Sequence, residues 1–288
     1  MDEQRTALVT GASSGIGSAI ARRLVHDGAR VLVGYHSGRS RAEQLCNTLN
    51  TSNVGEAVPV HIDLTDPRNI PSRFDELTAE FGPVHHLVNN AGVNDRSPAL
   101  ALDYARLEEV IAVNLSSPLL LSSAAACYFV ANDVTGSIVT VTSVHDQIPI
   151  TGGTLYCASK GGLAVASRAL ALEFAEHGIR LNLVAPGETA TPMNGTPQDS
   201  DGEIVERPAI PMGRAGQPAE IANAVAWLLS PEASYMTGAT LYVDGGLMLT
   251  AAEENAKAAS TPITSTKGHT HESSNNPPHR IRLGDPDH

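Results

Sequence analysis

Two side chains in the middle of the chain, Tyr156 and Lys160, could together move a proton. They are four residues apart in a helical pattern, so both lie on one face of the helix and can reach a shared ligand. Free tyrosine has a pKa of about 10 and is a poor base at neutral pH. A nearby ammonium favours the phenolate, and lowering the pKa by about 3 units requires about 4 kcal/mol. The pair therefore indicates a tyrosine acid or base assisted by lysine, although the same spacing is common on ordinary helix surfaces.

A glycine-rich turn follows the first predicted strand and could hold a phosphate. It comprises Gly11-Ala12-Ser13-Ser14-Gly15-Ile16-Gly17 and leads into a predicted helix. Glycines permit a tight turn and a close approach of the backbone to an anion. The free N–H groups and the positive dipole end of the following helix point at the same place. In the first strand-helix unit of a parallel sheet, such a turn predicts a dinucleotide-binding site.

The predicted strands and helices place these groups on a parallel sheet. Candidate strands are 6–10, 30–35, 57–62, 85–89, 137–142, 179–184 and 240–243. Candidate helices are 16–26, 41–48, 68–81, 104–131, 155–176 and 219–229. Most strands are apolar throughout, as strands covered on both faces are. This alternation predicts an α/β fold, a doubly wound (Rossmann) seven-stranded parallel sheet in a single domain.

Composition sets the expected boundaries of that domain. The predicted Rossmann domain covers residues 1–248 and carries both the cofactor site and the catalytic site. Residues 189–212 are rich in Pro, Gly, Thr and Asp, and a long excursion after a strand's carboxyl end overhangs the ligand crevice, so we expect a substrate lid there. Residues 249–288 are polar and have no aromatic side chain, which predicts a disordered tail.

Charge and composition narrow the classes of function. Acidic residues outnumber Lys and Arg by 31 to 19, and the net charge of −12 disfavours binding to nucleic acid or to anionic membranes. The longest nearly unbroken apolar stretch, Pro118–Ala131, has 14 residues, whereas a membrane-spanning helix needs about 20. The 3 scattered cysteines indicate neither a disulfide framework nor a zinc site, so no metal is expected. We expect a cytoplasmic protein with a small-molecule substrate.

Taken together, the motifs resemble the short-chain dehydrogenase/reductase family. The matching segments, in order, are Thr10 to Gly17, Asp63-Leu64, Asn89-Asn90-Ala91-Gly92, Asn114, Ser143, Tyr156-Cys157-Ala158-Ser159-Lys160, Pro186-Gly187 and Val243-Asp244-Gly245-Gly246. The resemblance implies an NAD(P)-dependent oxidoreductase that acts on CH–OH groups, commonly as a homotetramer. It implies that Tyr156 is the general acid or base on the substrate oxygen, that Lys160 also binds the nicotinamide ribose, that Ser143 holds the substrate oxygen, and that Asn114 supports a water-mediated proton path.

The resemblance also implies most of the cofactor contacts. They comprise Gly11, Ser13, Ser14, Gly15, Ile16, Gly17, Asp63 at the adenine edge, Leu64, Asn90, Ala91, Gly92, Tyr156, Lys160, Pro186, Gly187, Thr189 and Thr191. An acidic residue at the end of the second strand would bind the adenosine ribose and repel a 2′-phosphate. The chain has none there, and His36, Ser37, Arg39 and Arg41 favour a phosphate instead. We therefore expect NADP(H), with NAD(H) possible.

The segment after the fifth strand bears on the substrate. Its sequence, Ser143-Val144-His145-Asp146-Gln147-Ile148-Pro149, resembles the glucose 1-dehydrogenase group of the family. We expect a sugar or polyol whose reacting oxygen meets Ser143 and Tyr156, with His145 donating to a further hydroxyl. A loop histidine bonded to the backbone is an equally good interpretation of His145. Those sugar enzymes often carry a glutamate after Asn-Asn-Ala-Gly, where this chain has Val93-Asn94-Asp95.

Two other functions remain compatible with the motifs. A 3-oxoacyl-thioester (acyl-carrier-protein) reductase shares nearly all of them and would need basic residues at the mouth of the crevice, for which Arg96, Arg207 and Arg214 are candidates. A catalytically silent nucleotide-sensing protein would keep the fold without turnover, but the intact set of four catalytic candidates argues against it. The fold alone does not decide between these functions.

Overall fold

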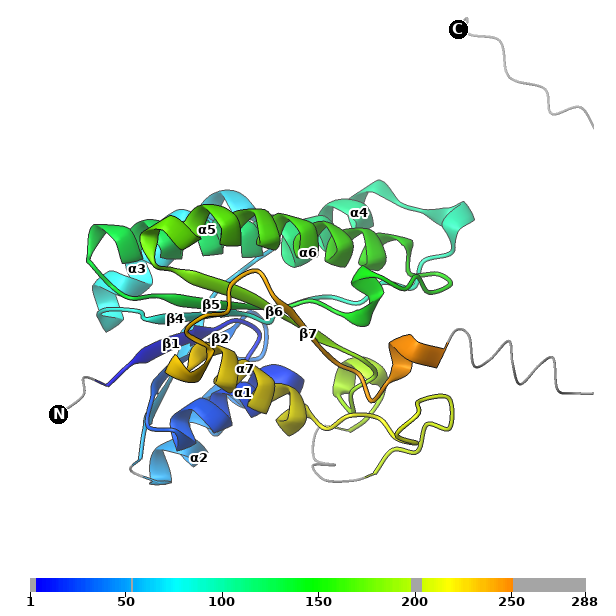
Figure 1. Cartoon of the computed structure of the whole chain (residues 1–288), viewed down its shortest axis with the longest axis horizontal. Coiled ribbons are helices and arrows are strands. Elements are labelled where there is room, and N and C mark those ends of the chain that lie inside the picture. Colours follow the sequence, from blue (N-terminus) through cyan, green and yellow to red (C-terminus); the bar gives the residue numbers. More distant parts are fainter. Residues whose placement is uncertain (1–3, 53, 198–203, 251–288) are drawn as a thin grey trace, which may run out of the picture. The chain divides into compact units, whose positions relative to one another are not determined.

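A computed structural model describes residues 4–52, 54–197 and 204–250, and its described part contains one seven-stranded parallel sheet. The strands lie in the order β3-β2-β1-β4-β5-β6-β7 (Figure 1). Their bounds are β1 Thr6–Val9, β2 Arg30–Tyr35, β3 Glu56–His61, β4 His86–Asn89, β5 Ser137–Val141, β6 Arg180–Pro186 and β7 Thr240–Val243. This arrangement confirms the predicted α/β fold and its doubly wound parallel sheet. The predicted tail, residues 249–288, lies almost entirely outside the described residues.

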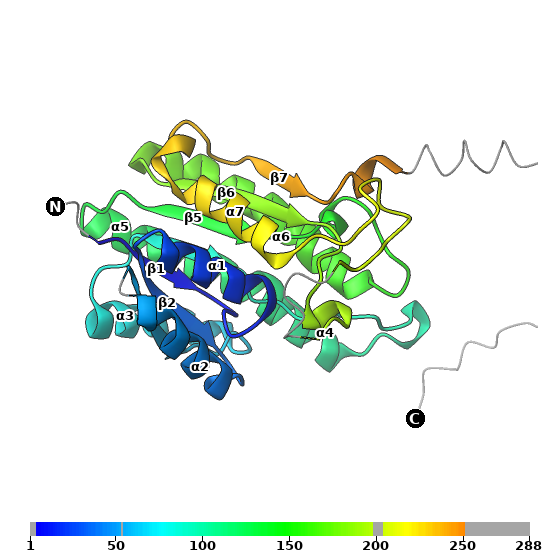
Figure 2. The same cartoon turned by 90° about the horizontal axis from the view of Figure 1, so that it is seen from below.

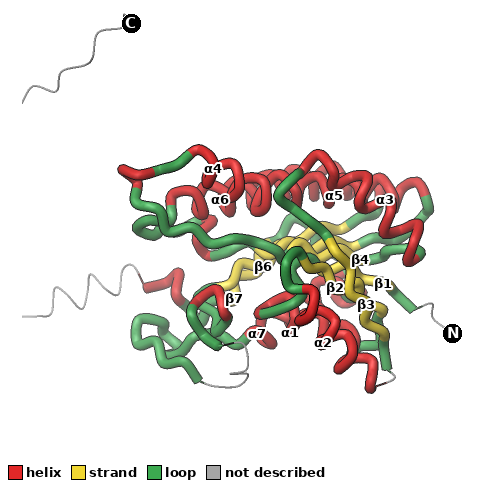
Figure 3. Tube along the Cα trace, turned by 180° about the vertical axis from the view of Figure 1, so that it is seen from behind, coloured by secondary structure: helices red, strands yellow, loops and turns green. Residues whose placement is uncertain are grey.

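Helices cover both faces of the sheet, as Figures 1 and 2 show from two directions. One layer comprises α1 Gly15–His26, α2 Arg39–Leu49 and α7 Pro218–Leu229. The other comprises α3 Ile70–Phe81, α4 Tyr104–Ile111, α5 Ser117–Ala131 and α6 Thr154–Phe174. Figure 3 shows the strands running between the two layers. A sheet buried on both faces explains why its strands are apolar at nearly every position.

The strand side chains alternate between two hydrophobic cores. Ala7 and Val9 of β1 pack with α1, α2 and α7, while Leu8 between them packs with α3, α5 and α6. The same alternation continues in β2, where Val31 and Val33 join the first core and Leu32 joins the second. All six side chains are fully buried. The two-residue period of a strand thus anchors one layer of helices on each side.

The predicted helix over 104–131 contains a local change of winding. It is continuous in space, but a π-helical turn, Ala112–Ser116, separates α4 from α5. Pro118, which has no N–H to donate to the preceding turn, lies in the first turn of α5, directly after the π-helical turn. The whole stretch Tyr104–Ala131 is long and apolar enough to cross a membrane, but half of its most apolar window is buried inside the protein, as in a core helix.

The strand order creates the place where a ligand can bind. From β1 the chain builds outward to β2 and β3, and then returns to β4 on the other side of β1. The loops after β1 and β4 therefore diverge to opposite faces, and a crevice opens at the carboxyl ends of these strands. The glycine-rich turn follows β1, and the segment from Asn90 follows β4.

Candidate active site

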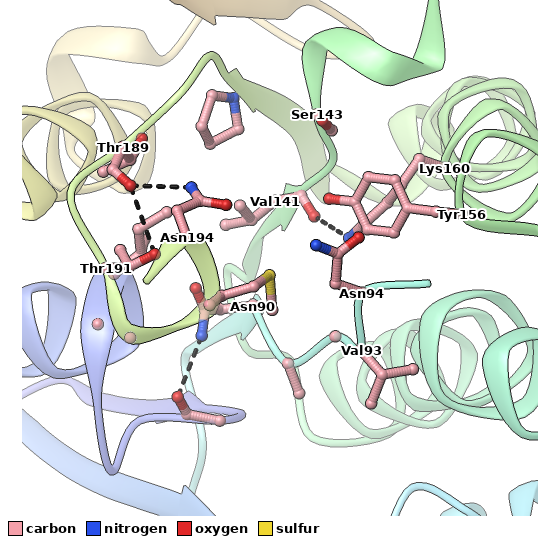
Figure 4. Close-up of a pocket in the computed structure, with 18 of the residues that line it drawn as sticks. Asn90, Val93, Asn94, Val141, Ser143, Tyr156, Lys160, Thr189, Thr191 and Asn194 are labelled. Carbon is pink, nitrogen blue, oxygen red and sulfur yellow. Dashed lines mark hydrogen bonds between the residues drawn. The ribbon is translucent and has the colours of Figure 1, made fainter. Parts of the chain in front are cut away.

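A cavity of about 760 Å³ lies at the carboxyl ends of the strands. The glycine turn, the loops after β2, β3, β4, β5 and β6, and the first turns of α6 form most of its walls, part of which Figure 4 shows. The sequence-predicted residues that line it are Gly11, Ser13, Ser14, Gly15, Ile16, Gly17, His36, Ser37, Leu64, Asn90, Ala91, Gly92, Ser143, His145, Tyr156, Lys160, Pro186, Gly187, Thr189 and Thr191. Three predicted residues, Arg39, Asp63 and Asn114, are not part of the wall.

The glycine turn is shaped to admit a phosphate group. Gly11 has a φ of +63°, and a Cβ there would lie 2.8 Å from the Cα of Ala91. A Cβ on Gly17 would overlap the carbonyl oxygen of Gly11 and lie 2.5 Å from Nδ2 of Asn90. Ser14, at the N-cap of α1, is extended and makes no side-chain cap bond. The first N–H groups of α1 therefore remain directed at the cavity, which fits the pyrophosphate of a dinucleotide.

The loop after β4 is fastened to the glycine turn by paired hydrogen bonds. Asn90 donates through Nδ2 to the carbonyl oxygen of Thr10 at 2.9 Å (Figure 4). The hydroxyl of Thr10 accepts from the backbone N–H groups of Asn90 and Ala91, each at 3.0 Å. The side chain of Asn90 therefore holds two loops together, and its part in a cofactor site is to fix their separation.

The reactive end of the cavity is built by α6 and the segment after β5. Lys160 is buried and donates through Nζ to the carbonyl oxygen of Val141 at 3.0 Å. Its Nζ lies 5.9 Å from the centre of the Tyr156 ring. The Ser143 hydroxyl accepts from the N–H of His145 at 3.1 Å and also interacts with the Tyr156 hydroxyl. Both hydroxyls and the ammonium thus belong to one wall, as Figure 4 shows.

Burial is the main influence on the pKa values of Tyr156 and Lys160. It raises the pKa of Tyr156 above its usual value, and the opposing influences of Ser143 and Arg96 are weaker. It lowers the pKa of Lys160 to about 8, against the attraction of the Asp146 carboxylate. The expectation that Lys160 lowers the pKa of Tyr156 is therefore not met by the chain alone. At pH 7 the lysine is mostly protonated and the tyrosine carries its proton.

Asn114 lies behind the cavity wall, in the π-helical turn. Its side chain is fully buried and bonds both backbone groups of Val93, accepting from the N–H at 2.8 Å and donating to the carbonyl at 2.9 Å. It also donates to the Ser159 hydroxyl at 3.1 Å. Since Ser159 lies between Tyr156 and Lys160, Asn114 joins the loop after β4 to the helix that carries the reactive pair.

Two of the predicted cofactor residues, Asp63 and Arg39, do not line the cavity and are bonded to residues close in the chain. The Asp63 carboxylate closes a turn, accepting from the N–H of Thr65 at 2.8 Å and from its hydroxyl at 2.7 Å. These bonds hold the pKa of Asp63 below its usual value. Arg39 is 75% exposed and pairs with Glu43 at 2.8 Å on the surface of α2. Arg41 lines the cavity instead, with its Nη2 placed beside Gly38.

The substrate end holds residues that the motifs did not single out. Asn94 and Ile150 line it, together with Arg96, which the sequence analysis names only as a candidate for a thioester substrate. No pattern in the sequence marks Asn94 and Ile150 as site residues, because they belong to loops without a fixed motif. His145 packs edge-on against the Tyr156 ring at 6.2 Å between centroids. Its Nδ1 is 2.9 Å from the carbonyl oxygen of Ile148, which is the loop arrangement that the sequence left open.

The predicted lid begins with an ordered turn. Pro192–Asn194 forms a short 3-10 helix, and Asn194 donates through Nδ2 to the carbonyl oxygen of Thr189 at 2.9 Å (Figure 4). The buried Thr191 hydroxyl bonds the same carbonyl at 3.4 Å. Further along, Arg207 pairs with Glu188 on the cavity wall. The middle of the predicted lid, 198–203, lies outside the described residues.

Comparisons with known proteins agree with this geometry. The family model described as "Enoyl-(Acyl carrier protein) reductase" matches residues 11–248. The chain is 39% identical over 246 residues to glucose 1-dehydrogenase 2 of Bacillus subtilis, covering 85% of this chain and 95% of that protein. It is 39% identical to a 3-oxoacyl-[acyl-carrier-protein] reductase of Salmonella typhimurium, covering 86% of this chain and 98% of that protein.

A solved structure extends the likeness to three dimensions. The structure of an acetoin dehydrogenase from Salmonella typhimurium superposes with a TM-score of 0.80 at 35% identity, covering 86% of this chain and 97% of that one. The acetoin dehydrogenase and the sequence relatives are named as enzymes that act on hydroxyl or carbonyl groups. The region that the family model matches, residues 11–248, contains the glycine turn, the cavity and the reactive pair. The chain therefore belongs to the short-chain dehydrogenase/reductase family and is an NAD(P)-dependent oxidoreductase acting on CH–OH groups.

Proposed function

We propose that the protein transfers hydride between NADP(H) and the carbonyl or secondary alcohol of a sugar or polyol. One observation carries the proposal: the anion-binding turn and the groups Ser143, Tyr156 and Lys160 line a single cavity. When bound, the nicotinamide supplies or accepts the hydride. The chain itself must bind the dinucleotide, orient the substrate oxygen and manage its proton.

We assign the transfer of the proton to Tyr156 and the orientation of the substrate oxygen to Ser143. Negative charge that develops on the substrate oxygen would meet two hydroxyl donors, which stabilise it. The ammonium of Lys160 favours the phenolate that remains after Tyr156 has donated its proton, and its burial strengthens that attraction. Asn114 keeps the loop after β4 and α6 at a fixed separation through its bonds to Val93 and Ser159.

The preference for NADP(H) is supported by the end of β2. No acidic side chain stands on the cavity wall there, where His36, Ser37 and Arg41 lie. None of the ion pairs among the described residues includes Arg41. We therefore assign the 2′-phosphate contact to Arg41, rather than to Arg39, whose charge already pairs with Glu43.

The ion pairs of the candidate arginines favour a sugar or polyol over a 3-oxoacyl thioester as substrate. Arg207 pairs with Glu188, and Arg214 makes two bonds to Glu220 at 2.8 and 2.9 Å. Only Arg96 of the three candidates lines the cavity without such a pair among the described residues. Among the described residues, these pairings argue against a basic mouth for an acidic carrier protein. The names glucose 1-dehydrogenase and acetoin dehydrogenase among the relatives also point to small hydroxylated substrates.

We further propose a cytoplasmic homotetramer that binds neither nucleic acid nor membrane. The net charge of −12 supports the last two points. Apolar side chains remain exposed on the outer surfaces of α5 and α6, among them Leu120, Val130, Val165 and Leu172. Such residues suit burial against a second copy of the chain.

Replacement of Tyr156 tests the proposed function. The absorbance of reduced nicotinamide is followed with NADP+ or NAD+ and sugars, polyols or hydroxyketones, and in reverse with NADPH and short 3-oxoacyl thioesters. Tyr156→Phe should lower kcat by about 10²- to 10⁴-fold, because general acid-base catalysis contributes that much, and should leave dinucleotide affinity unchanged. Tyr104→Phe, at an exposed tyrosine of α4, is the matched control. Full turnover by Tyr156→Phe, or dinucleotide binding without any turnover by the wild type, would contradict the proposal.

A further inference from the structure

The amide of Asn94 is the unused polar group of the reactive end. Asn94 lines the cavity, and its Oδ1 is buried without a hydrogen-bond partner among the described residues. Figure 4 shows the amide extending from the loop after β4 toward Tyr156 and Lys160. A buried acceptor left without a donor costs free energy, so its presence in a binding cavity calls for an explanation.

The backbone on both sides of Asn94 is fixed. Val93 is held through its N–H and its carbonyl by the buried side chain of Asn114. The Arg106 guanidinium binds the carbonyl of Asn94 at 2.5 Å and the buried carboxylate of Asp95 at 3.1 Å. The amide is therefore presented by a rigid support, as a group that recognises a ligand should be.

Donors of the chain itself do not satisfy this oxygen. The Lys160 ammonium is bonded to the carbonyl of Val141, although its Nζ lies close to the same loop, 3.5 Å from the position of a Cβ on Gly92. The Arg106 guanidinium is engaged by the backbone of Asn94, by Asp95 and by Glu109. A molecule bound in the cavity can supply the donor that the described residues do not.

We propose that Oδ1 of Asn94 accepts a hydrogen bond from a second hydroxyl of the substrate, on the carbon beside the reacting one. This inference rests on the proposed function, in which Tyr156 and Ser143 hold the first oxygen. Because the amide is directed at Tyr156, an oxygen that reaches it belongs to a carbon close to the reacting carbon. Asn94 then selects vicinal diols and α-hydroxyketones over simple alcohols and ketones. A substrate without the second hydroxyl leaves the acceptor unpaired, which is an effective basis for discrimination.

A matched pair of alcohols tests the selection. The values of kcat/KM for butane-2,3-diol and butan-2-ol are compared in the wild type, using the cofactor that supports turnover. The wild type should prefer the diol by roughly tenfold, the worth of one neutral hydrogen bond. Asn94→Ala should abolish the preference by lowering kcat/KM for the diol alone. Asn94→Asp keeps an acceptor oxygen in the same place and should retain the preference.

Further measurements separate recognition from a general structural role. Dinucleotide affinity and Tm should be unchanged in Asn94→Ala, and Asn47→Ala, at an exposed asparagine of α2, should behave as the wild type. An equal loss with both alcohols in Asn94→Ala, or no preference in the wild type, would overturn the inference while leaving the proposed function intact. Turnover confined to 3-oxoacyl thioesters would also overturn it. Full activity of Tyr156→Phe would instead remove the proposed function.

Discussion

The assignment of the 2′-phosphate contact separates two arginines that lie two residues apart. Arg41 lines the cavity beside Gly38, whereas Arg39 is paired with Glu43 on the far surface of α2. Arg41→Ala should therefore weaken binding of NADP+ and leave NAD+ nearly unaffected. Arg39→Ala removes the same charge from the same helix and should change neither affinity by more than about twofold, since its charge is already screened by a carboxylate and water.

The expected loss follows from the exposure of Arg41. A hydrogen bond to a charged group contributes about 1.5–3 kcal/mol when it is well shielded. Two unit charges about 4 Å apart in water attract by only about 1 kcal/mol. Because Arg41 stands at an exposed edge of the cavity, we expect about 1–2 kcal/mol, which is a five- to thirtyfold increase in the Kd of NADP+.

Fluorescence titration of the purified variants with NADP+ and NAD+ measures both affinities. The preference of the wild type for NADP+ should also shrink as ionic strength rises, because exposed charges are screened by salt. Equal weakening of NADP+ and NAD+ by Arg41→Ala, or a loss in Arg39→Ala as large as that in Arg41→Ala, would refute the reasoning.

Two further predictions concern the glycine turn and the pH dependence of folding stability. Gly17→Ala should lower dinucleotide affinity by more than tenfold and reduce Tm, because its Cβ would displace Gly11 or Asn90. A Cβ on Gly161 in α6 would lie 3.7 Å from the carbonyl oxygen of Asp146, an ordinary contact, so Gly161→Ala should raise the free energy of unfolding by about 0.5–1 kcal/mol. Equal effects of the two substitutions would contradict the argument. Burial lowers the pKa of His86 to about 3, so the unfolded chain binds more protons from about pH 6.5 downward and the free energy of unfolding falls by up to about 1.4 kcal/mol per pH unit. His86→Leu should flatten this dependence in urea unfolding at pH 7 and pH 5, and an unchanged slope would exclude His86 as its source.

The sheet could be predicted from the sequence because its strands are apolar and its helices have clear ends. The bounds of β2 and β7 agree with the prediction, and β3 differs by one residue at each end. The π-helical turn around Asn114 could not be predicted, since one extra residue in a turn leaves the apolar pattern of a long helix nearly intact. Its existence follows from the bonds that Asn114 makes across the interior.

The site shows where local patterns are insufficient. The predicted helix began at Arg41, which left Arg39 in a loop, but α2 begins at Arg39. Arg39 and Glu43 are then one helical turn apart and pair with each other. The Asp63 carboxylate accepts hydrogen bonds from Thr65, two residues further along the chain, as aspartates in turns commonly do. Asn94 is marked by tertiary contacts alone, because the residues that fix it belong to distant segments.

The π-helical turn makes the site depend on chain length as well as on residue identity. Removing one residue between 112 and 116 would let the helix bond regularly from Tyr104 to Ala131. Because the wide turn absorbs its extra residue without turning the helix that follows, Leu121, Ala125 and Phe129 would stay in the core that they fill. The Asn114 amide would instead lose the position from which it bonds Val93 and Ser159, so a deletion here removes a support of the site while sparing the packing of α5. Variation among functional descendants of this chain is therefore confined here to changes that preserve the count of residues.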